Sequence, residues 1–141
     1  MKKIHISFYD EVYCEYFEVF IGYKKFEEIR DAKNKWQQQS WKDVFDESAK
    51  KSFNRSDGLY LRRVLKDRKC KRYVNFIIVS PSSNSKRSML TTIIHESLHA
   101  TLKILHESGI SFREESVGEP FTYYQEMIVN KILDKLKFIC G

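Results

Sequence analysis

The sequence predicts an α+β domain in which a small, mainly antiparallel sheet packs against helices. Four segments are rich in β-branched and aromatic residues, which is typical of strands. Three further segments repeat apolar residues at helical spacing. The predicted order is strand, strand, helix, strand, strand, helix, helix, and no repeat or internal boundary interrupts it. Residues 1–141 are therefore expected to form a single domain.

The first half of the chain is predicted to begin with two strands, at residues 3–9 and 15–21. A helix is expected at 23–32, where apolar residues recur near one face. The polar stretch 34–54 is predicted to hold a short helix around residues 41–45. Its tip is interpreted as a mobile segment or lid.

The second half is predicted to contain two strands, at 58–64 and 72–80, and then two long helices. The first helix covers 89–106, begins between Ser85 and Ser88, and ends at Gly109. The second opens at 118–128, where Pro120 suits the first helical position. The two helices are expected to form an αα-hairpin.

The first of these helices carries a metal-binding signature, His95-Glu96-Ser97-Leu98-His99. Residues four apart project from the same helical face, so the rings of His95 and His99 can reach one ion at the roughly 2.0–2.1 Å of Zn–N bonding. Glu96 is rotated off that line and would stand beside the metal as a general base. The motif predicts a Zn²⁺ site for metal-assisted hydrolysis.

Catalytic zinc usually has three protein ligands, so a third must come from elsewhere in the chain. His106 is about 10 Å along the helix axis from His99 and cannot share the ion. We expect Glu119, at the start of the second helix, to reach back across the hairpin. Glu126, two turns later on the same helical face, is the competing choice. The remaining acidic candidates, which lie in the preceding loop, are Glu114 and Glu115.

The pattern His95-Glu96-x-x-His99 followed by Glu119 resembles the gluzincin branch of zinc metallopeptidases, and its Glu-Pro-x-x-Tyr-Tyr context resembles small, phage-borne minimal zincins. The resemblance covers roughly residues 73–136. It implies a zincin-like metallopeptidase domain with an active-site helix followed by a C-terminal helix. The implied roles are metal ligand for His95, His99 and Glu119, general base and acid for Glu96, and oxyanion stabiliser for Tyr123 or Tyr124.

Two other zincin branches fit the sequence less well. The metzincin pattern requires Gly at 102 and His at 105, where this chain has Leu102 and Leu105. The SprT-like branch takes a downstream histidine as its third ligand, and no histidine follows His106. In zincins the strand before the motif helix often borders the cleft, so the resemblance implies that residues 73–80 form an edge on which an extended peptide substrate could add.

The composition favours a folded, cytoplasmic protein. Hydrophobic residues make up 42% of the chain, yet no run approaches a membrane span, and the N-terminus leads directly into strand-like sequence instead of a signal peptide. We therefore expect no membrane association. Three widely spaced cysteines, Cys14, Cys70 and Cys140, are expected to be reduced thiols.

The net charge of +6 is local, because residues 62–72 contain seven basic side chains and one acid. We expect this turn, from Arg62 to Arg72, to be a solvated hairpin edge that discourages aggregation. Nucleic-acid binding through the same patch is the alternative. The leading hypothesis for function is a zinc-dependent peptidase acting on a peptide or protein substrate. The second is a zincin-fold binding protein whose zinc is structural or whose activity is lost, and which acts on a host or regulatory partner.

Overall fold

The computed structural model describes residues 2–67, 70–80, 85–110 and 118–140, with the backbone alone for 118–119 and 137–140. Within these ranges the chain forms four strands and five helices. Their bounds are β1 Ile4–Asp10, β2 Glu15–Ile21, α1 Phe26–Arg30, α2 Gln38–Val44, α3 Glu47–Arg55, β3 Gly58–Lys66, β4 Lys71–Val79, α4 Lys86–Glu107 and α5 Gly118–Cys140. The predicted α+β class is confirmed.

The four strands form one mixed sheet in the order β1-β2-β4-β3. The β1–β2 and β3–β4 pairs are antiparallel hairpins, whereas β2 and β4 are parallel. The chain leaves β2, passes through three helices to reach β3, and returns by the second hairpin, which brings β4 beside β2 in the same direction. Two of the three pairs are antiparallel, as predicted for most of the sheet, and the central pair is parallel, so the sheet is mixed.

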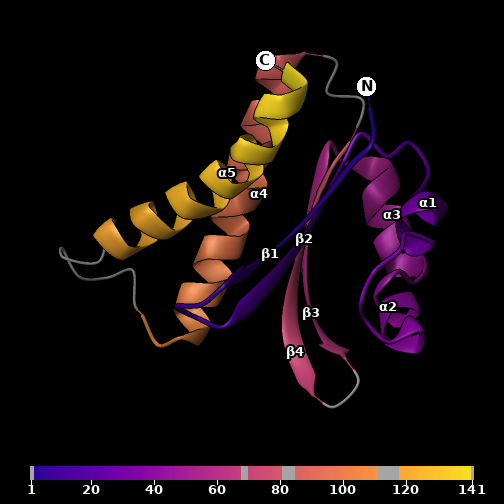
Figure 1. Ribbon diagram of the computed structural model, residues 1–141, viewed down its shortest axis with the longest axis horizontal. Coiled ribbons are helices and arrows are strands. Elements are labelled where there is room, and N and C mark those ends of the chain that lie inside the picture. The colour runs from indigo at the N-terminus through magenta and orange to yellow at the C-terminus, as the bar shows by residue number, and fades with distance from the viewer. Residues whose placement is uncertain (1, 68–69, 81–84, 111–117, 141) are drawn as a thin grey trace.

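Helices cover both faces of the sheet, as Figure 1 shows: α1, α2 and α3 on one face, α4 and α5 on the other. Successive side chains of a strand point to opposite faces, so each central strand contributes to two cores. Val19 and Ile77 lie in the core beneath α4 and α5. Phe20 and Phe76 lie in the core beneath α1–α3. This layering fixes α4, the motif helix, against one face of the sheet.

The polar stretch 34–54 contains two helices, α2 and α3, and is not a lid. Trp41 is completely buried, and its indole Nε1 donates to the backbone oxygen of Arg30 over 3.0 Å. Asp46 caps α3 by accepting a hydrogen bond from the backbone nitrogen of Ala49 at 2.9 Å. The few buried side chains are separated by many polar ones, so the helical pattern is weak in the sequence. The helix predicted at 23–32 is shorter than expected and corresponds to α1.

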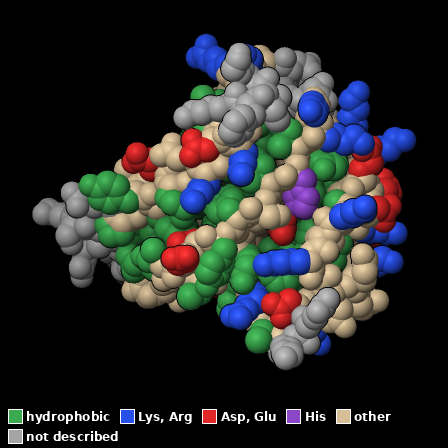
Figure 2. All heavy atoms as spheres, in the orientation of Figure 1, with side chains coloured by type: hydrophobic (Ala, Val, Ile, Leu, Met, Phe, Trp, Pro, Cys, Tyr) green, Lys and Arg blue, Asp and Glu red, His purple; other side chains and the backbone are tan. Residues whose placement is uncertain are grey.

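The surface mixes hydrophobic and charged side chains. On the face seen in Figure 2, hydrophobic side chains lie over α5 among a few charged ones, while many lysine and arginine side chains, with some acidic ones, lie on the side of the first three helices. Cys14 and Cys70 are free and exposed, whereas the side chain of Cys140 lies outside the described residues. No helix in the described ranges combines the length and the apolar character needed to cross a membrane.

Candidate metal centre

The motif helix α4 is delimited by its sequence signals. Ser85 is the N-cap, and its hydroxyl accepts a hydrogen bond from the backbone nitrogen of Ser88 at 3.0 Å. The helix ends at Glu107, and Gly109 follows in the left-handed conformation with φ of 82°. Because glycine has no Cβ, it adopts this conformation without steric cost. The predicted start and stop of this helix are confirmed.

His95 and His99 lie on the exposed face of α4, one turn apart. Their Nε2 atoms are 3.1 Å apart, and the two rings are inclined at 79°. Two nitrogen ligands of a tetrahedral zinc at 2.0–2.1 Å lie about 3.3 Å from each other. The separation of these nitrogens therefore fits a shared divalent ion, with both rings open to solvent.

Glu96 is buried beside this pair, with 6% of its surface exposed. Its Oε1 lies 3.9 Å from the Nε2 of His95. Burial raises the pKa of the Glu96 carboxyl above its usual range, while the imidazoles of His95 and His99 oppose the shift. A carboxylate that holds its proton more tightly than a solvated one is a stronger base, which suits general acid–base chemistry.

The start of β3 closes over Glu96 because residue 58 is glycine. A Cβ added to Gly58 would lie 2.5 Å from Thr92 Cγ2 and 2.8 Å from Glu96 Oε1. Both distances are shorter than van der Waals contact allows. The absent side chain thus lets strand β3 approach α4 at the position of the candidate base.

We expect Gly58→Ala to destabilise the protein by about 1–3 kcal/mol, because Thr92 and Glu96 must move to admit the methyl group. Urea denaturation measures the loss. Thr92→Ser removes the Cγ2 atom and keeps a hydroxyl, so combining it with Gly58→Ala should restore part of the stability. A Gly58→Ala protein as stable as the wild type would show that the contact is not restrictive.

The third ligand is the part of the predicted centre that the described residues do not supply. The side chain of Glu119, and all of Glu114 and Glu115, lie outside them. Within those ranges no third His, Cys, Asp or Glu joins the histidine pair in an arrangement able to hold a metal ion, and Glu126 is exposed elsewhere on α5. Gln125 Nε2 donates to the Ile94 backbone oxygen over 3.2 Å. The two helices diverge from there toward the start of α5 (Figure 1).

The two tyrosines of α5 differ in their surroundings. Tyr124 is buried, and its hydroxyl donates to Asp10 Oδ2 over 2.8 Å. Burial and the bond to Asp10 raise the pKa of Tyr124. Tyr123 is 65% exposed. Tyr124 therefore joins α5 to the end of β1, and of the two only Tyr123 remains available as an oxyanion stabiliser.

The edge strand beside the motif is β3, and the prediction that residues 73–80 form that edge is wrong. Residues 73–79 belong to β4, which lies between β2 and β3. Because β4 pairs with β2 over residues 74–79 and with β3 over residues 71–79, most of its backbone groups are already used within the sheet. The hydrogen-bonding edge nearest Glu96 belongs to β3, through Gly58.

Arg62 is not part of the solvated basic edge that the sequence predicted. Its guanidinium forms ion pairs with Glu15 and Glu107, and it stacks 4.1 Å from the ring centroid of Tyr73. Glu15 also accepts a hydrogen bond from Asn75 Nδ2 over 3.1 Å. The network links β2, β3 and β4 to the end of α4. In the sequence Arg62 stands among the other basic residues of β3 and the following turn, so nothing local separates it from the exposed Arg63 and Lys66.

Comparisons with known proteins add no relative. No family model matches the chain, and no curated protein or solved structure shows significant similarity to it.

Proposed function

We propose that the protein is a zinc-dependent metallopeptidase in which His95 and His99 hold the ion and Glu96 acts as general base. The observation that carries the proposal is the 3.1 Å separation of the two Nε2 atoms. A buried carboxylate 3.9 Å from the first imidazole supports it. Neutral imidazole nitrogens are ligands that zinc prefers, and Glu119 is the carboxylate we propose as third ligand.

Zinc at this position would supply Lewis-acid chemistry, acidifying water to a pKa of about 7 and polarising the scissile carbonyl group. Glu96 would take a proton from the attacking water and return it to the leaving amine. Its burial against Gly58 keeps bulk water from most of the carboxylate. Tyr123 is the proposed donor to the developing oxyanion.

An extended polypeptide is the substrate that the neighbouring surface favours. β3 is an edge strand whose first residue touches Glu96, so a peptide added along it would pass the candidate base. At the other end of β3, Gln37 N already donates to Lys66 O over 2.8 Å. Exposed apolar side chains follow α4 beside the histidines and could contact apolar substrate residues; they are Leu90, Ile94, Leu98 and Leu102.

Zinc binding tests the ligand assignment. We expect the wild type to bind one equivalent of zinc, and His95→Ala or His99→Ala to weaken binding by more than about 100-fold. His106→Ala is the matched control, since His106 is exposed on the same helix outside the motif. Isothermal titration with zinc measures each affinity. Equal zinc affinity in the wild type and the His95→Ala variant would refute the centre.

Cobalt substitution tests the third ligand. Glu119→Gln should change the visible absorption of the cobalt protein and weaken metal binding by about 10-fold or more. Glu126→Gln makes the same substitution at an exposed position of the same helix and should leave the absorption and the metal affinity unchanged. The reverse result would assign the third position to Glu126.

A further inference from the structure

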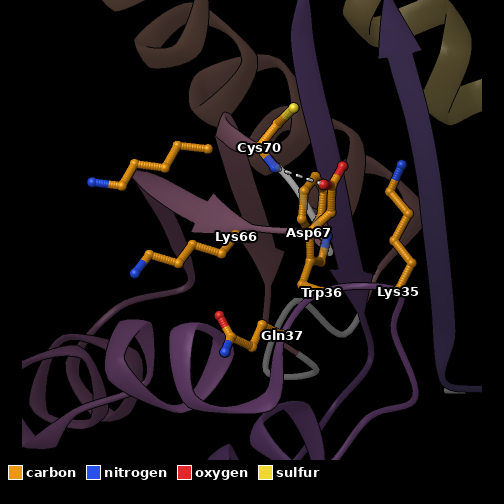
Figure 3. Close-up of a pocket in the computed structure, with 7 residues that line it drawn as sticks. Lys35, Trp36, Gln37, Lys66, Asp67 and Cys70 are labelled. Atoms are coloured by element: carbon orange, nitrogen blue, oxygen red, sulfur yellow. Dashed lines mark hydrogen bonds between the residues drawn. The ribbon is translucent and has the colours of Figure 1, made fainter.

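A hollow on another part of the molecule is lined by basic side chains. Its volume is about 690 Å³, and it lies where the loop before α2 meets the far end of the β3–β4 hairpin (Figure 3). Lys35 and Gln37 line it from the loop, and Lys66 and Lys71 from the hairpin. No residue of α4 or α5 takes part, so the hollow is separate from the candidate metal centre.

Three lysines and one aspartate, Asp67, are the charged side chains that line this hollow. Among the residues that the structure describes, Lys35, Lys66 and Lys71 form no ion pair with a carboxylate. A second hollow of about 400 Å³ shares Lys66 and Lys71 and adds Arg63, so the two adjoin. In the first hollow, Asp67 Oδ1 accepts a hydrogen bond from Cys70 N over 3.2 Å (Figure 3).

Aromatic rings continue the surface beyond Lys35. The Nζ of Lys35 lies 4.0 Å from the ring centroid of Tyr16 and 4.9 Å from that of Trp36. A third hollow of about 310 Å³ is lined by Lys35 together with Tyr9 and Tyr16. Tyr9 is 40% exposed, and its ring centroid lies 4.5 Å from that of Tyr16. We call the three adjoining hollows the lysine groove.

We propose that the lysine groove binds single-stranded nucleic acid. Lys35, Lys66 and Lys71 would contact successive phosphates, and the exposed ring of Tyr9 would stack on a base. Cations beside an aromatic platform are the combination that single strands use, because every unpaired base offers a π-face. A duplex buries its bases and has no use for Tyr9, and an acidic peptide would engage only the lysines.

Fluorescence anisotropy with labelled oligo(dT) and oligo(U) of about 20 nucleotides tests the proposal. We expect affinity to fall with salt, with a log–log slope of about −2 to −3 for three or four phosphate contacts. Lys66→Glu combined with Lys71→Glu should weaken binding by at least about tenfold. Lys131→Glu combined with Lys135→Glu makes the same charge change at exposed positions of α5 and should weaken it less than about twofold.

Tyr9→Leu tests the aromatic contact, since it keeps the net charge and should weaken oligonucleotide binding by about five- to 100-fold. If the Lys66 and Lys71 variant does not fold by circular dichroism, Lys35→Gln in the loop replaces it. Three results would overturn the proposal: no binding at about 50 mM salt, equal losses in the groove and α5 variants, or poly-glutamate or duplex bound as tightly as the single strand. None of these readouts depends on zinc or peptidase activity.

Discussion

Glu96→Gln is expected to lower peptide hydrolysis by about 10²–10⁴-fold while zinc binding stays unchanged. Glutamine has the shape of the carboxylate but cannot take a proton from water. Glu96 is 6% exposed beside the two histidines, so the substitution changes the reacting group without opening the surface. Cleavage of a broad peptide library, followed by mass spectrometry with zinc-loaded protein, measures the loss.

Two controls make the Glu96 result specific. Glu126→Gln changes the same residue type at an exposed position on α5 and should cleave at the wild-type rate. Zinc titration of the Glu96→Gln protein should give the wild-type affinity, because the carboxylate is not a proposed ligand. If Glu96→Gln cleaves as fast as wild type, the general-base assignment is wrong. If zinc-loaded wild type cleaves no peptide, the peptidase assignment is wrong.

Local signals in the sequence were sufficient to predict the motif helix and most strands. Ser85 and Gly109 mark the ends of α4 through capping and left-handed geometry, which depend on a few neighbouring residues. The spacing of His95 and His99 predicts two nitrogens on one helical face, and the structure places them 3.1 Å apart. Such features need no knowledge of the rest of the fold.

Features set by long-range packing were not predicted. In the sheet β4 is central and β3 is the edge, and the sequence of residues 71–79 does not determine which strands pair with β4. Trp41 is buried against Phe20 and Phe76 from distant strands, so the polar segment 34–54 packs on one face of the sheet. The burial of Arg62 likewise depends on Glu15 and Glu107, which are 47 and 45 residues away.

Arg62→Met is expected to destabilise the protein by about 3–5 kcal/mol, because it leaves a buried carboxylate without its counter-ion. The side chains of Arg62 and Glu15 are 9% and 5% exposed, so water cannot replace the lost partner. Urea denaturation at neutral pH measures the change. Arg63→Met, at the exposed neighbouring position, should alter stability by less than about 0.5 kcal/mol.

The pH dependence of this loss tests the contribution of the Glu15 carboxylate. Burial raises the pKa of the Glu15 carboxyl despite the adjacent guanidinium, so the folded state binds this proton more tightly than the unfolded chain. The stability linked to that proton is present at low pH and is lost as the pH rises through the raised pKa. Removing Arg62 raises the pKa further, and the loss should therefore shrink as the pH falls and Glu15 becomes neutral.

A double-mutant cycle separates this ion pair from simple loss of packing by Arg62. Glu15→Gln removes the buried charge, so the Arg62→Met and Glu15→Gln double variant should be more stable than the Arg62→Met variant, with a coupling energy of about 1–3 kcal/mol. Additive effects would mean that the guanidinium acts through its packing on Tyr73 instead. Because Arg62 also pairs with Glu107 in α4, a second cycle with Glu107→Gln in place of Glu15→Gln tests whether the sheet is joined electrostatically to the helix that carries His95 and His99.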